Sequence, residues 1–319
     1  MTAIPRILVH SPRQDEAQRY ADLIRLHSPD ADIVVSTTAE DAERLIDDAE
    51  ILMGWHFPPP IFKKAARLRW IHKVSAGVDD VPMDTAISAH VVLTRSNGAL
   101  IAPRMIEYVV GAIFAIVQHF RQAWRQQLDR RWEAFPVGLA HGSTVGVAGL
   151  GDIGEAIAHA LQRNGMRVIG WRRTQTASSG VERVYAGLAE LEAFATACDF
   201  LVIVLPATAS TRGIFSGEVF GAMKPSSWLI NLGRGSVVDE PALIAALRGG
   251  TLAGAVLDVF AEEPLPATSP LWGLDNVLIT PHVAGPIVPE DVVGCFLENF
   301  IHYRRGEPMR RQVDRARGY

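Results

Sequence analysis

The stretch that decides the fold is TVGVAGLGDIG, residues 144–154. It begins as a short apolar strand, turns through a GxGxxG motif and opens a helix. The apolar residues that follow share one face of that helix, at positions Ile153, Ile157 and Leu161. A strand, a glycine turn and an amphipathic helix in this order are typical of a dinucleotide-binding α/β domain.

Each glycine of the motif has its own physical reason. Gly149 permits the tight turn, Gly151 lets a pyrophosphate approach the backbone, and Gly154 lets helix and strand pack closely. The helix N-terminus adds unpaired N–H groups and a positive dipole end, which favour phosphate. The predicted cofactor contacts in this turn are Gly149, Gly151, Asp152, Ile153 and Gly154.

The end of the next apolar strand, residues 166–171, predicts which dinucleotide binds. An NAD-binding domain usually carries an acidic residue there for the ribose 2′-hydroxyl. This chain has Arg172, Arg173 and Thr174 instead. Two guanidiniums can bind a 2′-phosphate through charge-assisted hydrogen bonds, so we expect NADP(H) to be preferred, with NAD(H) still possible.

The same alternation of apolar strands and amphipathic helices runs through most of the chain, and 319 residues are enough for two domains. Strands are expected near residues 6–10, 32–35, 50–53, 68–74, 91–94, 144–148, 166–171, 227–230, 254–260 and 277–282. Near-continuous apolar strands separated by helices indicate parallel sheets covered on both faces. The expected fold class is therefore α/β, with two Rossmann-like or flavodoxin-like parallel-sheet domains.

Three chemically useful residues each follow one of the later strands: Arg234, Glu263 and His282. Open α/β sheets bind their ligands at the carboxyl ends of the strands. A fixed cation, a carboxylate and an imidazole at that edge can hold an anionic substrate and move a proton. Taken singly, each could equally be a surface charge or a structural hydrogen-bonding group.

Several linked motifs make the chain resemble the D-2-hydroxyacid dehydrogenase family over nearly its whole length. The motifs are LPAT at 205–208, MKP at 223–225, NLGRG at 231–235, LDVF at 257–260, EPL at 263–265, PLW at 270–272 and TPH at 280–282. The spacings of 29 residues from Arg234 to Glu263 and 19 from Glu263 to His282 match the family pattern. The early Trp55-His56 and the ending at 313–319 are similar to bacterial glyoxylate/hydroxypyruvate reductases of type A.

The resemblance implies reversible hydride transfer between a nicotinamide and a 2-oxo acid. His282 would be the general acid, Glu263 would keep it charged and oriented, and Arg234 would bind the substrate carboxylate. Further substrate contacts implied are Trp55, Ala76 and Gly77, and further cofactor contacts are Pro206 and Asp258. It also implies that a nucleotide-binding domain, 99–285, is inserted into a substrate domain formed by 1–98 and 286–319. The segment after His282 departs from the family pattern, with Pro286 and Pro289 stiffening the return to the first domain.

Bulk properties exclude several other classes. The formal net charge of −4 gives no support for nucleic-acid binding, and Cys198 and Cys295 are too isolated for a disulfide framework or a metal site. We expect no signal peptide and no membrane-spanning stretch, and therefore a cytoplasmic protein. Six arginines near the C-terminus, between 304 and 317, read as a solvated basic tail or, alternatively, as a phosphate- or partner-binding segment.

A single helix is expected from Pro103 to about Gln127, apolar on nearly all sides and therefore deeply buried. With Trp124 and Trp132 close by, it predicts a homodimer formed through the nucleotide-binding domains. In some relatives a tryptophan from this arm reaches the partner's active site, so Trp132 is a candidate for that role.

Two other functions stay open. The chain could be a broad D-2-hydroxyacid dehydrogenase for larger 2-oxo acids. It could also be a non-catalytic protein that senses NAD(P), because related co-repressors retain the same three residues. Against that second possibility, the chain has no long disordered extension to carry interaction motifs.

Overall fold

The computed structural model describes residues 4–81, 87–96, 98–176 and 178–315. The chain forms two compact units, one from Met1–Leu100 with Ile287–Tyr319 and the other from Ile101–Pro286. Each unit is built on one parallel sheet, which confirms the expected fold class.

Unit 1 is a five-stranded sheet in the order β2-β1-β3-β4-β5, with every pair parallel. This order is that of flavodoxin-like sheets. Its elements are β1 Arg6–His10, α1 Gln14–His27, β2 Asp32–Ser36, α2 Ala39–Leu45, β3 Ile51–Gly54, α3 Ile61–Lys64, β4 Trp70–Lys73, β5 Val92–Arg95 and α10 Pro289–Arg305.

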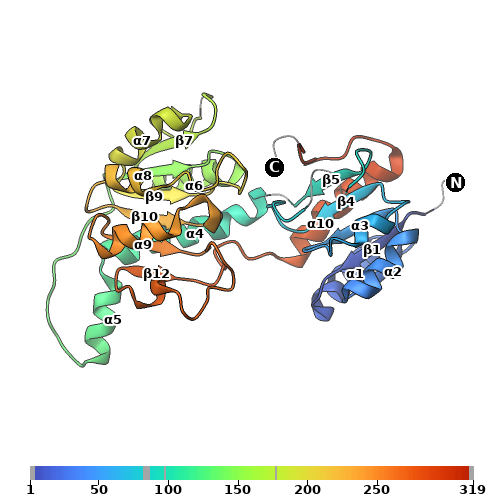
Figure 1. The fold of residues 1–319 in the computed structure, drawn as a ribbon, viewed down its shortest axis with the longest axis horizontal. Helices are drawn as coiled ribbons and strands as arrows, with labels where there is room; N and C mark the ends of the chain where they lie inside the picture. The colour runs from blue at the N-terminus through green and yellow to red at the C-terminus, as the bar shows by residue number, and fades with distance from the viewer. Residues whose placement is uncertain (1–3, 82–86, 97, 177, 316–319) are drawn as a thin grey trace. The chain divides into compact units, whose positions relative to one another are not determined.

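The last helix belongs to the unit that contains the N-terminus. Helix α10 packs beside α1 on one face of the sheet, while α2 and α3 cover the other (Figure 1). The indole of Trp70 stacks on Phe296 with ring centroids 4.8 Å apart. Strand β4 and helix α10 are more than 200 residues apart in sequence. Their contact therefore packs the C-terminal helix against the sheet formed by the first strands.

The basic C-terminal segment is folded onto unit 1. Arg304, Arg305 and Arg310 stay exposed, as expected, whereas Arg311 and Arg315 are half-buried. Arg304 pairs with Asp30 at 2.9 Å, and Arg311 pairs with Glu298 at 2.9 Å. Arg315 donates to the carbonyls of residues 87, 88 and 91. Arg317 lies outside the described residues.

Unit 2 is a seven-stranded parallel sheet in the order β12-β11-β10-β9-β6-β7-β8. Its elements are α4 Gly98–Val117, α5 Phe120–Leu128, β6 Thr144–Ala148, α6 Asp152–Arg163, β7 Arg167–Arg172, β8 Val184–Ala186, α7 Leu191–Ala197, β9 Phe200–Ile203, α8 Gly217–Ala222, β10 Trp228–Asn231, α9 Glu240–Arg248, β11 Gly254–Leu257 and β12 Val277–Ile279. Strands β6 and β9 are neighbours although β7 and β8 separate them in sequence. The order therefore reverses between β6 and β9, as it does at the ligand-binding switch point of a Rossmann sheet.

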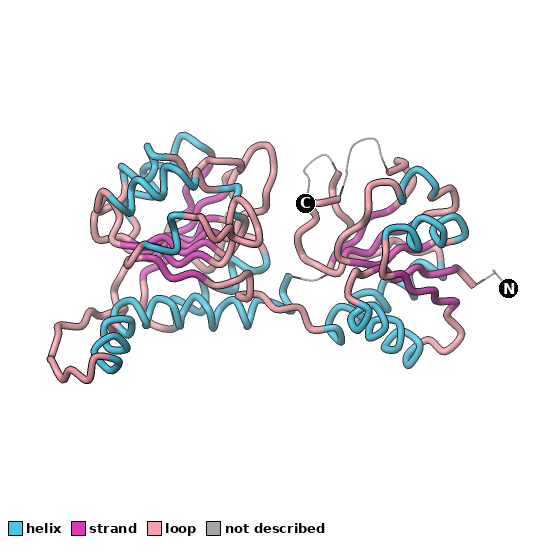
Figure 2. Tube along the Cα trace, turned by 60° about the horizontal axis from the view of Figure 1, so that its bottom comes forward, coloured by secondary structure: helices cyan, strands magenta, loops and turns pink. Residues whose placement is uncertain are grey.

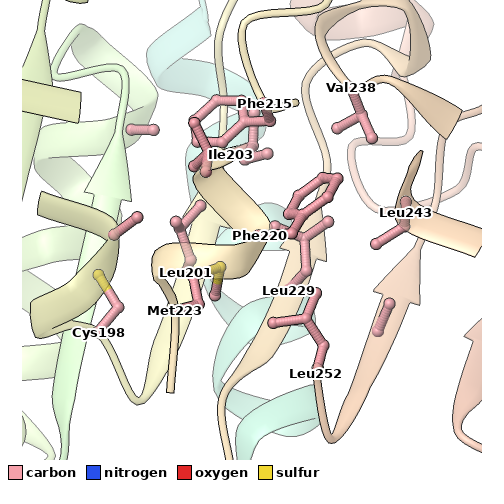
Figure 3. Close-up of a cluster of buried hydrophobic side chains, with 14 of the residues drawn as sticks. Cys198, Leu201, Ile203, Phe215, Phe220, Met223, Leu229, Val238, Leu243 and Leu252 are labelled. Carbon is pink, nitrogen blue, oxygen red and sulfur yellow. The ribbon is translucent and has the colours of Figure 1, made fainter. Parts of the chain in front are cut away.

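Both faces of this sheet are covered by helices (Figure 2). Helices α4 and α6 bury one apolar cluster, and α7, α8 and α9 bury the other. Figure 3 shows the second cluster, in which Phe220 of α8 lies close to Leu229 of β10. Two buried faces explain why the strands read as near-continuous apolar runs.

The single helix expected from Pro103 to Gln127 is wrong in both its bounds and its burial. Helix α4 begins at Gly98, with Pro103 inside it, and ends at Val117. His119 then adopts a left-handed conformation with φ 51°, and α5 starts at Phe120 in a new direction. No glycine or proline marks this break, so the apolar pattern gave no sign of it.

Helix α4 buries only one side. Val109 and Ile113 are fully buried against the sheet, whereas Phe114 is 37% exposed. By length and composition alone the helix passes as a membrane span, although it carries two charged residues, Arg104 and Glu107. Its buried side packs on β6 and α6 as part of the core of unit 2.

Candidate active site at the carboxyl edge of the unit 2 sheet

Arg234, Glu263 and His282 follow three adjacent strands. Strand β10 pairs with β11, and β11 pairs with β12, all in parallel register. The three residues therefore emerge at the same edge of the sheet. The structure brings them together as the sequence predicted.

Glu263 and His282 form a hydrogen-bonded pair. His282 Nδ1 lies 2.8 Å from Glu263 Oε2, and the other carboxylate oxygen, Oε1, accepts the Phe260 N–H at 2.9 Å. The hydrogen bond to Glu263 is the largest cause that raises the pKa of His282, outweighing burial and the positive charge of Arg234, which lower it. Burial alone would raise the pKa of Glu263, but the bonds from His282 and Phe260 bring it below its usual value. Near neutral pH the pair thus favours imidazolium and carboxylate.

Arg234 projects from a turn held by the side chain of Asn231. The Asn231 amide accepts the Gly233 N–H at 3.1 Å and donates to the Arg234 carbonyl at 3.1 Å. A Cβ on Gly235 would lie only 1.8 Å from the Phe260 carbonyl carbon, so glycine is required for this turn to approach the Glu263 loop. The guanidinium is close enough to lower the pKa of both Glu263 and His282.

Two residues of this site, Asn231 and Thr280, were given no role in the sequence analysis. Asn231 is 1% exposed and belongs to the NLGRG motif. Its position directly before the turn could have indicated that its side chain bonds to the turn. Thr280 stands inside the TPH motif and donates to Asp258 at 2.5 Å. Asp258 itself is 1% exposed and follows β11 directly.

The glycine turn after β6 has the geometry that its sequence predicts. Gly149 has φ 106°, a conformation that favours glycine. A Cβ on Gly154 would stand 1.8 Å from the Gly149 carbonyl oxygen, so α6 packs closely on the turn. A Cβ on Gly151 would meet no described atom within 4 Å, which leaves the backbone there open to a ligand. Asp152 and Ile153 begin α6, so its free N–H groups face this opening.

The end of β7 carries Arg172, Arg173 and Thr174, with no acidic side chain among them. Arg172 is half-buried, and its guanidinium has no hydrogen-bond or ion-pair partner within the described residues. Arg173 and Thr174 are exposed. Pro206 follows β9 across the switch point from the glycine turn, and its carbonyl accepts from the Thr211 hydroxyl at 2.6 Å.

The predicted substrate contacts Trp55, Ala76 and Gly77 lie in unit 1, after β3 and β4, and all three are half-buried. Carbonyls of the loop after β4 are already engaged, with Arg95 donating to Ala76 at 3.3 Å and the Ser75 hydroxyl to Gly77 at 2.7 Å. In the part of the chain that the structure describes, the N–H groups of Ala76 and Gly77 have no acceptor. Successive free N–H groups form a concave site for an anion.

Residues 110–284 match the family described as "D-isomer specific 2-hydroxyacid dehydrogenase, NAD binding domain". The chain is also 34% identical over 278 residues to glyoxylate/hydroxypyruvate reductase A of Citrobacter koseri, covering 86% of this chain and 88% of the relative. The chain belongs to the D-isomer-specific 2-hydroxyacid dehydrogenase family.

Solved structures of family members agree with this membership. A D-isomer specific 2-hydroxyacid dehydrogenase from Xanthobacter autotrophicus, in complex with NADPH and MES, is 34% identical, with a TM-score of 0.90 over 99% of this chain and 100% of that one. An NADPH-dependent glyoxylate/hydroxypyruvate reductase from Sinorhizobium meliloti, in complex with NADP and sulfate, is 29% identical, with a TM-score of 0.89 over 99% of this chain and 100% of that one.

No cluster in the sequence has the spacing of ligands for a metal ion. Among the described residues there is no group of three or more His, Cys, Asp or Glu side chains placed to bind one. Cys198 is buried, which raises the pKa of its thiol, and Gly146 leaves room for its sulfur. We assign Cys198 to packing.

Proposed function

We propose that this protein reduces small 2-oxo acids with NADPH, converting glyoxylate to glycolate and hydroxypyruvate to D-glycerate. The observation that carries the proposal is the His282–Glu263 pair, 2.8 Å apart, with Arg234 beside it at the carboxyl edge of the sheet. The relatives named as glyoxylate/hydroxypyruvate reductases support the choice of substrate.

The nicotinamide would supply hydride to C2 of the substrate. Negative charge then grows on the carbonyl oxygen, and an imidazolium is the group that can donate a proton to it near neutral pH. Because Nδ1 of His282 is bonded to Glu263, Nε2 is the ring nitrogen left to donate. Glu263 keeps the ring charged and fixes its orientation.

Substrate binding is assigned to a guanidinium and to backbone N–H groups. Arg234 would pair with the substrate carboxylate and polarise the carbonyl. The free N–H groups of Ala76 and Gly77 would bind the remaining carboxylate oxygen, and Trp55 would add apolar contact. In this proposal residues 1–98 with 286–319 form the substrate domain, and 99–285 form the NADP-binding domain.

The residues present fit NADP(H). The open backbone at Gly151 and the start of α6 suit the pyrophosphate, with contacts from Gly149, Asp152, Ile153 and Gly154. Arg172, Arg173 and Thr174 would bind the 2′-phosphate, and no carboxylate repels it there. Pro206 and Asp258 would complete the cofactor contacts, and NAD(H) would be a poorer substitute.

A panel of glyoxylate, hydroxypyruvate, pyruvate and bulkier 2-oxo acids, each with NADPH and with NADH, tests the proposal. The two small acids with NADPH should give the highest kcat/KM. Highest activity with bulky acids would favour the broad D-2-hydroxyacid dehydrogenase instead. NADPH binding without turnover of any acid would favour the NAD(P)-sensing function.

We further propose a cytoplasmic homodimer with no nucleic-acid or membrane partner. The exposed side of α4, helix α5 and the segment after it would form the interface. Large apolar side chains lie in solvent there: Trp124 is 64% exposed and Leu128 is 83% exposed in α5, and Trp132 is fully exposed in the segment after it. Figure 1 shows it as a long arc beyond α5. Burying these side chains against a second copy would remove apolar surface from water, and Trp132 is the residue proposed to reach the partner's active site.

A further inference from the structure

The backbone of His282 is held in an uncommon conformation. Its φ is 54°, in the left-handed region that residues other than glycine rarely occupy. A residue stays there only when its surroundings hold it. The contacts around this turn therefore decide where the imidazole points.

Asp258 supplies most of those contacts. Its carbonyl oxygen accepts the His282 N–H at 2.9 Å. Its carboxylate accepts the next two N–H groups, from Val283 at 2.8 Å and from Ala284 at 2.9 Å. Three successive amides of the turn are thus bonded to one buried residue.

A chain of hydroxyl groups extends from Asp258 to helix α4. Thr280 donates to Asp258 Oδ1 at 2.5 Å, and Thr280 Oγ1 lies 2.6 Å from the hydroxyl oxygen of Tyr108. The single hydroxyl proton of Thr280 is used by Asp258, so Tyr108 must be the donor in the second bond. Burial, the largest cause, raises the pKa of Tyr108 to about 12, so it stays a donor over the working pH range.

The turn also packs on the helix that carries Tyr108. Ala284 is 3% exposed and belongs to the same buried cluster as Met105. A Cβ on Gly285 would meet Met105 at 3.3 Å. Helix α4 is therefore the support against which the turn is fixed.

From this geometry we infer that Tyr108, Thr280 and Asp258 form a hydrogen-bonded relay that positions His282 for proton transfer. What His282 does once positioned rests on the proposed function. Tyr108 and Thr280 are positioning residues, since neither is proposed to touch substrate or cofactor. The relay gives Asp258 a task that is separate from any contact with the nicotinamide.

Two variants interrupt the relay, and two matched variants leave it intact. Thr280→Val removes the hydroxyl at nearly constant shape, whereas Thr280→Ser keeps it. Tyr108→Phe removes the outer hydroxyl with little change of packing. Tyr185→Phe is its control, because Tyr185 of β8 is buried in unit 2 and packs on Phe194 away from the turn.

The kinetic measurements are kcat and KM with glyoxylate, together with NADPH affinity from quenching of tryptophan fluorescence. In Thr280→Val we expect kcat to fall roughly tenfold or more, because a misplaced acid transfers its proton poorly. KM and NADPH affinity should stay within about twofold of wild type, since neither binding surface is altered. Tyr108→Phe should also lower kcat, but by a smaller factor, with KM and NADPH affinity nearly unchanged. The two controls should behave as wild type.

A second readout needs neither substrate nor cofactor. The His282 imidazole is titrated by NMR in the cofactor-free protein, where the charged groups facing it are Glu263, Arg234 and Asp258. A loosened turn weakens the hydrogen bond from His282 to Glu263, so the midpoint of the His282 titration should lie at lower pH in Thr280→Val than in wild type. In Thr280→Ser it should equal the wild-type value.

Wild-type kcat together with an unmoved His282 midpoint in both Thr280→Val and Tyr108→Phe would overturn the relay. A loss confined to NADPH affinity would also overturn it, because Thr280 would then support only the cofactor contact of Asp258 and not the position of His282. If the wild-type protein reduces no 2-oxo acid, the proposed function fails, and the titration alone still decides the relay.

Discussion

At the scale of single residues, replacing Arg234 tests substrate recognition, because this side chain is proposed to bind the substrate carboxylate. In Arg234→Ala no other described cation replaces its fork-shaped donor beside His282. Truncating a charged, desolvated contact costs about 2–5 kcal/mol, so kcat/KM should fall by roughly 30-fold or more. Steady-state kinetics with glyoxylate measure this, and near wild-type kcat/KM would remove Arg234 from the site.

The charges around His282 predict opposite pH shifts in two variants. The raised pKa of His282 keeps it protonated to higher pH, so reduction should decline as pH rises through that pKa. Glu263→Gln removes the negative partner that raises the pKa, and the declining limb should move to lower pH. Arg234→Ala removes a positive charge that lowers the pKa, so its residual activity should decline at higher pH than in wild type.

The pH dependence of kcat/KM in wild type and both variants tests the signs. If kcat/KM of Glu263→Gln declines at the same pH as that of wild type, the result would contradict the pairing of Glu263 with His282 in the structure. A downward shift in Arg234→Ala would contradict the placement of its charge next to the imidazole.

At the scale of elements, the turn between β6 and α6 allows a test with two neighbouring glycines. In Gly154→Ala the new methyl would lie 1.8 Å from the Gly149 carbonyl, so α6 must shift. Overpacking of this kind costs about 1–3 kcal/mol, and the unfolding temperature should fall along with NADPH affinity. Gly151→Ala meets no described atom within 4 Å, so it should weaken NADPH binding without lowering the unfolding temperature. Equal loss of thermal stability in both variants would argue against the assigned roles.

The end of β7 determines cofactor choice in this account. Each charge-assisted bond to the 2′-phosphate contributes about 1.5–3 kcal/mol, or roughly tenfold or more in relative kcat/KM. Arg172→Ala should lower the preference for NADPH over NADH, and Arg172→Asp should lower it further by repelling the phosphate. Both are compared with wild type at low ionic strength, where an exposed contact is least screened. If the ratio of kcat/KM with NADPH to kcat/KM with NADH is unchanged in Arg172→Asp, the end of β7 does not bind the 2′-phosphate.

The sequence predicted most of the strands whose pattern is set by burial on both faces or by a glycine motif, although β9, which is buried along its whole length, was not among those expected. Strands β6, β7, β10, β11 and β12 lie within a few residues of their expected bounds, and the residues that follow them meet at one edge. It did not predict the break at His119, because a left-handed residue without glycine or proline leaves no mark on hydrophobic periodicity. Nor did it predict Tyr108 beside Thr280, a contact across 172 residues that only the packing of α4 creates.

At the scale of the whole molecule, the exposed apolar side chains of α5 and the segment after it predict a homodimer. Trp132 is fully exposed and Trp124 is 64% exposed. Tryptophans contribute strongly when they are buried at the centre of an interface. Light scattering should give the mass of two chains at micromolar concentration, and Trp132→Ala with Trp124→Ala should shift the equilibrium toward monomer.

A monomer at that concentration in the wild-type protein would refute the dimer. A suitable control is Leu26→Ala, because Leu26 is also exposed, at 71%, but belongs to α1 in unit 1. It should leave the mass unchanged.

The central claim is that His282 is the proton donor of an NADPH-dependent 2-oxo acid reductase. The most direct test follows NADPH oxidation by glyoxylate in wild type and in His282→Gln, with NADPH affinity measured on the same samples. We predict oxidation by wild type, and a fall in kcat of roughly 100-fold or more in His282→Gln with affinity for NADPH retained. Wild-type protein that binds NADPH but oxidises it with no 2-oxo acid, or a His282→Gln variant with near wild-type kcat, would contradict the account.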